Sequence, residues 1–201
     1  MHRHRHRWMA NMVLRDAKMP DALIQNTLQY GVLFFASTSI LIIGGLMAAL
    51  GASDEAQAML NELPFVSPFT RAAWELKVLL VIFIYTFAFF KFAWSYRLFN
   101  YVLIMIGAAA DASVPGSVGS DSENARYASA VAQMHTLGAR HFSTGMNSYF
   151  FALAAIAWFL NPLLFIVATI WVSLVLYRRA FRSQFAKILE GLEDNTAEPG
   201  S

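Results

Sequence analysis

Apolar stretches without charge, separated by short polar segments, dominate this chain. Residues 28–50 contain no charged residue. A helix of this length reaches roughly 34 Å at about 1.5 Å per residue, which is enough to cross a hydrocarbon core of about 30 Å. A second stretch, 74–96, carries a tryptophan near each end, where membrane interfaces favour that residue. The two stretches predict two membrane-spanning helices.

The third apolar stretch, residues 142–177, is too long for a single span. It holds no charge and is interrupted only by the pair Asn161-Pro162. Proline removes a helix hydrogen bond and pushes the preceding residue out of the α region. The pattern leaves two interpretations, which are one long kinked helix or two spans, 142–160 and 163–177, joined by a tight turn.

Positive charge favours the two-span interpretation, because Lys and Arg concentrate in cytoplasmic segments. With four spans, the N-terminus, the middle segment 107–140 and the C-terminus share one side. All Lys and Arg except Arg71 and Lys77 then lie on or near that side. We therefore expect an all-α membrane bundle of about four spans with both termini in the cytoplasm. It would form one domain over residues 1–190, followed by a flexible acidic tail at 191–201.

The segments outside the spans carry weaker signals. Residues 1–21 are basic and amphipathic. They suit a helix lying on an anionic leaflet, or a flexible basic tail followed by a short helix. Residues 107–122 are rich in Gly, Ser and other small residues and predict a loop. Ser120 and Glu123 are spaced as a capping box, which predicts that a helix begins near Asp121.

Composition agrees with a membrane protein and excludes several chemistries. The chain is 57% hydrophobic and 14% charged, whereas soluble domains hold about 45–50% apolar and about 25% charged residues. It has no cysteine, which excludes disulfides and thiolate ligands. No catalytic, cofactor or metal-ligand motif is present, and the basic N-terminus is too short to indicate nucleic acid binding. Membrane lipids explain it, with headgroup contacts expected at Arg3, Arg5, Arg7, Arg178 and Arg179.

Two stripes of small residues predict close helix packing, because such residues let two backbones approach each other. Each stripe repeats at spacings of three or four and therefore occupies one helix face. The first consists of Gly44, Ala48 and Ala52, and the second of Gly145, Ser148, Ala152 and Ala155. The partner helix of each stripe, in the same chain or in another, stays open at this point.

Charged residues at membrane depth are the remaining candidates for function. Lys91 lies about five residues inside the second span. Its side chain either reaches the headgroups or makes an internal ion pair or a substrate contact. Glu75 and Lys77 lie at the other end of that span. Arg71 and Glu75, four residues apart, can pair along the helix.

Three segments resemble one family of bacterial inner-membrane proteins. They are FFAST at 34–38, FFKFAWSYRLFNY at 89–101 and HFSTGMNSYFFALA at 141–154. The family is catalogued as a domain of unknown function (family 599), and the resemblance implies a multi-span membrane protein without an assigned activity. It also implies an arginine near position 147 and an apolar helix before the Arg-Trp-Met segment. Here Asn147 stands at that position, and the chain starts almost at that segment.

Three functions follow as hypotheses. The first is a non-catalytic accessory or scaffold subunit that packs against other membrane subunits or against copies of itself. The second is a small oligomeric transporter or channel that uses Lys91, Arg97 and Glu75. The third is a membrane enzyme that acts on a lipid or quinone at the cytoplasmic interface, with His135, His141 or Arg140 as its reactive residues.

Overall fold

The computed structural model describes residues 2–55, 58, 70–109 and 119–181. This part of the chain is helical and contains no strand. Its helices are α1 (His2–Val13), α2 (Met19–Gly51), α4 (Arg71–Ala108), α5 (Asp121–Leu160) and α6 (Pro162–Phe181). The predicted acidic tail at 191–201 and most of the predicted loop at 107–122 lie outside the described residues.

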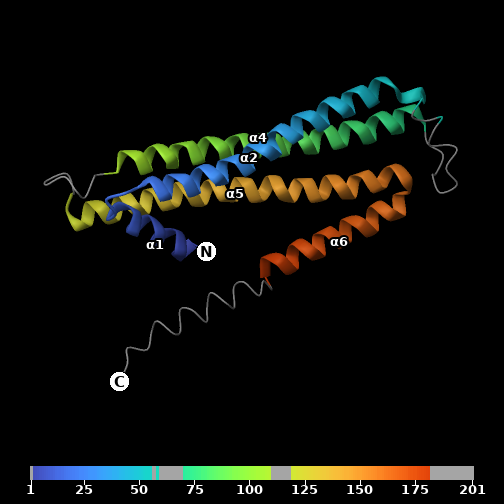
Figure 1. The fold of residues 1–201 in the computed structure, drawn as a ribbon. Coiled ribbons are helices and arrows are strands. Elements are labelled where there is room, and N and C mark those ends of the chain that lie inside the picture. Colours follow the sequence, from blue (N-terminus) through green and yellow to red (C-terminus); the bar gives the residue numbers. More distant parts are fainter. Residues whose placement is uncertain (1, 56–57, 59–69, 110–118, 182–201) are drawn as a thin grey trace.

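Three long helices, α2, α4 and α5, run side by side along the length of the molecule (Figure 1). α4 packs against both α2 and α5, while α6 folds back along α5 and α1 packs on the opposite end of α5. α5 has 40 residues and α6 has 20, so α6 accompanies only about half of α5. The first half of α5 therefore projects past α6 on the side where α1 lies.

Within the described residues, three helices are long and apolar enough to cross a membrane, namely α2, α4 and residues 162–179 of α6. The predicted spans 28–50, 74–96 and 163–177 lie inside these helices. The predicted span 142–160 is the second half of α5, which packs between α4 and α6. α4 continues to Ala108, so the predicted loop begins two residues later than the sequence suggested.

The pair Asn161-Pro162 separates two helices, as the two-span interpretation requires. Asn161 is extended (φ −156°, ψ 135°), which is the conformation favoured before proline. Its side-chain Oδ1 accepts a hydrogen bond from the N–H of Leu163 at 2.8 Å, so Asn161 caps the helix that Pro162 begins. Lys77 of α4 donates to the backbone carbonyl of Trp158 at 3.0 Å and thereby satisfies an acceptor in the last turn of α5.

The other predicted boundary is also present. α5 begins at Asp121, and Ser120 and Glu123 form the capping box. The backbone N–H of Ser120 donates to the Glu123 carboxylate at 2.8 Å. This hydrogen bond lowers the pKa of Glu123, because it favours the ionised carboxylate.

Aromatic rings hold the middle of the bundle together. Each of the three aromatic-rich segments, 34–38, 89–101 and 141–154, contributes to this cluster. The ring centroid of Phe35 on α2 lies 5.7–5.9 Å from three others, those of Phe92, Phe142 and Tyr149. Phe92 of α4 is completely buried among them. The residues that carry the family resemblance thus meet in one core layer, although they lie on three different helices.

Polar side chains join the same helices beside the aromatic cluster. Ser95 of α4 donates to the carbonyl of Gly138 on α5 at 2.8 Å. The Tyr149 hydroxyl donates to the carbonyl of Phe35 at 3.0 Å and lies 3.0 Å from the hydroxyl oxygen of Ser39. Inside a membrane no water competes for these polar groups, so such hydrogen bonds between apolar helices stabilise their association in addition to packing.

One of the two small-residue stripes is buried within the chain, and the other is exposed. Gly145 lies so close to α4 that a Cβ atom there would be 2.6 Å from the Phe92 ring, and Ser148, Ala152 and Ala155 are buried with it. In contrast, Gly44 and Ala48 of α2 are exposed, and a Cβ atom at Gly44 would meet nothing within 4 Å. Ala52, just past the end of α2, is exposed as well. The described part of the chain therefore uses one stripe and leaves the other uncovered.

We predict that Gly145→Ala destabilises the protein whereas Gly44→Ala does not. The new methyl group at 145 must displace a buried ring, and such overpacking costs about 1–3 kcal/mol. At position 44 the methyl group enters open space. Replacing glycine by alanine inside a helix stabilises the folded protein by about 0.5–1 kcal/mol, because glycine loses more conformational entropy on folding. Thermal unfolding of both variants in detergent measures the difference. Equal unfolding temperatures for the two variants would contradict the packing of Phe92 on Gly145.

Candidate functional site at the junction of α1 and α5

The apolar face of α1 is buried in the protein. Met9, Met12 and Val13 have at most 3% of their surface exposed. They share a core cluster with Val102 and Ile106 of α4 and with Ala128, Val131 and Ala132 of α5. This corrects the interpretation of a flexible basic tail, because residues 2–13 form a helix whose apolar face packs on α4 and α5. Arg3 and Arg7 stay exposed on its outer side.

A buried carboxylate anchors α1 to the start of α2. Asp21 has no exposed surface, and its Oδ1 accepts hydrogen bonds from Trp8 Nε1 at 2.6 Å and from the Arg15 guanidinium at 2.7 Å. Hydrogen bonds to an ionised group are the stronger kind. Asp21 Oδ2 has no hydrogen-bond partner among the described residues. The sequence alone does not single out Asp21, since an acid in a first helical turn is an ordinary helix signal.

His135 lies directly behind Trp8. Its ring centroid is 5.5 Å from that of Trp8 and 5.2 Å from that of Phe99. The residue is 4% exposed, and neither ring nitrogen has a hydrogen-bond partner in the described chain. Burial, and secondarily the charge of Arg5, lower its pKa to about 4. The imidazole is therefore neutral at neutral pH.

Trp8, Asp21 and His135 form a buried polar cluster. Two glutamines of α2 extend this cluster toward the membrane. Gln25, fully buried, directs its amide nitrogen to the carbonyl of Phe99 at 3.4 Å. One turn further, Gln29 donates to the side chain of Asn100 at 2.9 Å. The cluster consequently joins α1, α2, α4 and α5 through polar groups that are largely hidden from solvent.

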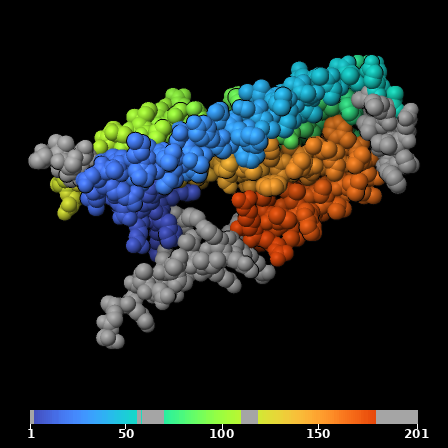
Figure 2. All heavy atoms as spheres, in the orientation of Figure 1, coloured from blue at the N-terminus to red at the C-terminus, as the bar shows by residue number. Residues whose placement is uncertain are grey.

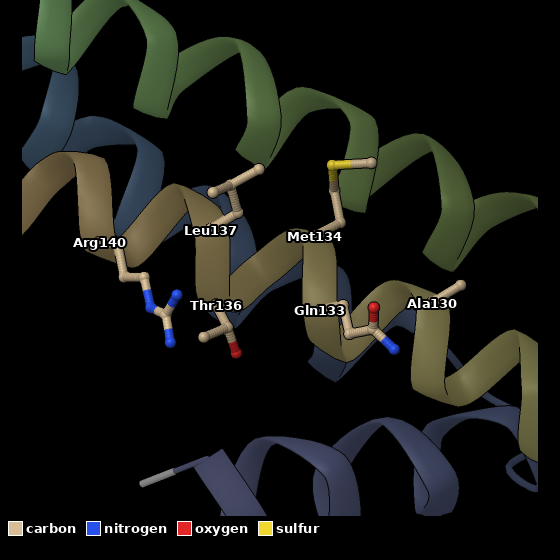
Figure 3. A pocket seen from close by; sticks show the side chains of 6 residues that line it. All are labelled: Ala130, Gln133, Met134, Thr136, Leu137 and Arg140. Carbon is tan, nitrogen blue, oxygen red and sulfur yellow. The ribbon is translucent and has the colours of Figure 1, made fainter.

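The charge of Arg140 on α5 acts on Arg5 of α1 at the outer edge of the cluster. Arg5 of α1 is half-buried, and its pKa is lowered by burial first and by the charge of Arg140 second. Arg140 of α5 borders a cavity of about 500 Å³. The other residues that line this cavity also lie on α5 and are Ala130, Gln133, Met134, Thr136 and Leu137 (Figure 3).

The residues proposed for transport are not gathered into one site. Glu75 pairs with Arg71 at 2.9 Å at the start of α4. Lys91 lies 16 residues further along α4, which is roughly 24 Å, and its Nζ sits 5.0 Å from the centre of the Phe87 ring. Arg97 donates to the Tyr101 hydroxyl at 2.6 Å on the exposed surface.

The two histidines proposed for catalysis lie in different surroundings. His135 is buried against Trp8, whereas His141 is partly exposed and its ring centroid lies 6.4 Å from that of Trp94. Among the described residues, no group of three or more His, Cys, Asp or Glu is arranged to hold a metal ion. Arg178 and Arg179, expected at the headgroups, are exposed in the last turn of α6.

Residues 1–185 match the family described as "Protein of unknown function, DUF599". The chain belongs to this family. The match covers every described helix, so the buried cluster around Asp21 and His135 lies within the family's domain. No curated protein and no solved structure matches the chain.

We predict that mild acid weakens the packing of α1 through His135. The pKa of this residue is about 4 in the fold and 6.5 in an unfolded chain. Between these values the unfolded chain binds more protons, so the stabilisation is complete above pH 6.5 and declines as the pH falls toward 4. From pH 7.5 to 5.5, the free energy of unfolding should decrease by about 1.4 kcal/mol.

The measurement is thermal unfolding in detergent at the two pH values, with His135→Phe as the matched variant. Phenylalanine retains the ring and cannot be protonated, so it should remove this part of the pH dependence. If the wild-type protein and the variant lose stability equally on acidification, His135 does not titrate as described.

Proposed function

We propose that this chain is a non-catalytic subunit that assembles with other membrane-protein chains, or with copies of itself, in the inner membrane of a bacterium. The observation that carries this proposal is the uncovered stripe of Gly44, Ala48 and Ala52 on α2. The matching stripe on α5 is filled by the Phe92 ring of the same chain. Since small residues admit a second helix closely, the open stripe suits a helix from another chain.

The exposure of α6 supports the same proposal. None of its membrane-spanning window is buried within the described structure, and among the described helices it packs mainly against α5. Its surface includes large apolar side chains such as Ile170 and Trp171, with 60% and 69% of their surface exposed. Figure 2 shows α2 and α6 on one face of the molecule, with α5 between them. A partner that reaches α2 would lie close to α6 as well.

The separation of the charged residues favours this function over transport. A pathway for ions or small solutes needs polar groups that face one another across the membrane. Glu75, Lys91 and Arg97 instead interact with neighbours one turn away on the same helix. The described charges thus support the fold locally and do not line a common channel.

The proposal includes four membrane spans with both termini in the cytoplasm. The helix ends support this topology, because α1, the end of α4 and the start of α5 lie at one end of the bundle and the Asn161 turn at the other (Figure 1). Basic residues flank α6 at its last turn, at Arg178 and Arg179. The second half of α5 then serves as the third span.

We predict that a cysteine at position 161 is labelled from outside the cell. The chain has no cysteine of its own, so Asn161→Cys reports a single position. An impermeant maleimide applied to cells with a permeabilised outer membrane should modify it. Ser122→Cys, at the exposed start of α5, should react only after the inner membrane is opened. The reverse labelling pattern would contradict the topology.

We predict that Gly44→Leu breaks the assembly without unfolding the chain. A leucine side chain fills the stripe, but it meets nothing within the chain, because the space around the Cβ position is open. After gentle extraction from native membranes, native gel sizing should show a large particle for the wild-type protein and a single chain for the variant. Mass spectrometry of the wild-type particle then identifies its partner chains.

The matched control is Gly31→Leu on the same helix. Gly31 is exposed, and a Cβ atom there would also meet nothing within 4 Å. It lies thirteen positions before Gly44 on α2. At about 100° per residue it therefore lies roughly 140° around the helix. Gly31→Leu should leave the particle size unchanged. A wild-type protein that is extracted as a single chain, or a Gly44→Leu particle of unchanged size, would refute the proposed assembly.

A further inference from the structure

The buried cluster at the junction of α1 with the long helices contains polar atoms to which the described residues supply no hydrogen-bond partner. They are Asp21 Oδ2, Gln25 Oε1 and both ring nitrogens of His135. The exposed fractions of these three residues are 0%, 0% and 4%, so bulk solvent does not reach them. A buried polar atom without a protein partner is costly, and ordered water supplies the missing hydrogen bond in many proteins. Four such atoms in one cluster point to a bound ligand.

Helix geometry and shared neighbours bring these atoms together. Asp21 and Gln25 lie four positions apart on α2 and are both fully buried, so they share a helix face and their Cβ atoms are about 5–6 Å apart. Trp8 joins Asp21 to His135, because its Nε1 donates to Asp21 Oδ1 at 2.6 Å and its ring centroid lies 5.5 Å from that of the imidazole. Phe99 joins Gln25 to His135 in the same way. Its carbonyl accepts from the glutamine amide at 3.4 Å, and its ring centroid lies 5.2 Å from that of the imidazole.

The contacts already made in the cluster determine which hydrogen bonds are still open. Asp21 Oδ2 is an acceptor, and so is Gln25 Oε1, because the amide nitrogen of Gln25 faces the Phe99 carbonyl. A neutral imidazole adds one N–H donor and one acceptor. The open set therefore contains three acceptors and one donor. Direct pairing of these side chains with one another would still leave acceptors without a donor.

The charges of the cluster favour a neutral ligand over a cation. The Arg15 guanidinium pairs with Asp21 at 2.7 Å, so the charge of the buried carboxylate is already balanced. A further positive ion would add an uncompensated charge to an apolar setting, which is costly. A neutral molecule that donates two hydrogen bonds and accepts one matches the open set, and water is the smallest molecule that does so.

From this arrangement we infer that an internal water molecule binds between Asp21 Oδ2 and Gln25 Oε1, donates a hydrogen bond to each and accepts one from the N–H of His135. Two hydrogen bonds of about 2.8 Å span oxygen atoms up to roughly 5.5 Å apart, which suits side chains one helical turn apart. The water thereby links α2 to α5. This site goes beyond the proposed assembly and does not depend on it, since a protein extracted as a single chain would refute the assembly and leave the water site untouched.

The first test measures the transfer of magnetisation from water to His135 by solid-state NMR, with the full chain in lipid bilayers and its histidines labelled with nitrogen-15. His135→Phe identifies the signal, because it removes one of the five histidines. We expect rapid transfer to His135 although the residue is 4% exposed. Gln25→Met replaces the amide by an apolar side chain of similar length and should slow the transfer at least twofold. Gln29→Met is the matched control and should leave it unchanged, since Gln29 pairs directly with Asn100.

A double-mutant cycle distinguishes a shared water molecule from side chains that act independently. The unfolding temperature is measured for Gln25→Met, for His135→Phe and for the double variant. If both side chains hold the same water, either substitution already removes it, so the double variant should lose clearly less than the sum of the two single losses. Gln29→Met combined with His135→Phe should be additive. The water site is refuted if the transfer to His135 is equally fast in the wild-type protein and in Gln25→Met, or if the first cycle is additive.

Discussion

The contact between the Phe92 ring and the backbone of α5 at Gly145 sets the geometry of the bundle. There is no room for a side chain at this point, so the Phe92 ring of α4 lies directly against the backbone of α5. The ring of Phe92 is also surrounded by aromatic rings of α2 and α5. One buried side chain of α4 therefore contacts both α2 and α5, and the hydrogen bonds of Ser95 and Tyr149 join the same helices beside it.

At the end where α1 lies, the fold depends on polar groups placed in an apolar setting. Burial of a carboxylate is costly unless strong hydrogen bonds compensate for it. Asp21 receives such bonds from Trp8 and Arg15, and Trp8 in turn covers His135. Loss of the carboxylate would consequently affect the ring packing as well as the ion pair. The cluster thereby holds α1 against the ends of the long helices.

The parts of the fold that follow from local chemistry could be predicted from the sequence. The turn at Asn161-Pro162 and the cap at Ser120 depend on residues within a few positions of each other. The burial of Asp21 and His135 could not be predicted, because it depends on α1 folding back antiparallel on α5, more than 100 residues away in the chain. The two small-residue stripes show the same limit. Gly44 and Gly145 each begin a stripe of small residues, and the Phe92 ring lies against the second glycine only.

The position of α1 has a consequence for biosynthesis. Met9 and Met12 pack on Ala128, Val131 and Ala132, so α1 waits for residues synthesised about 120 positions later. At translation rates of about 5–20 residues per second, this interval is on the order of ten seconds. During that time α2 and α4 can insert while two buried methionines of α1 remain uncovered. Helix α1 thus leaves the ribosome before α2, α4 and α5 but completes its native contacts only after α5 has been made.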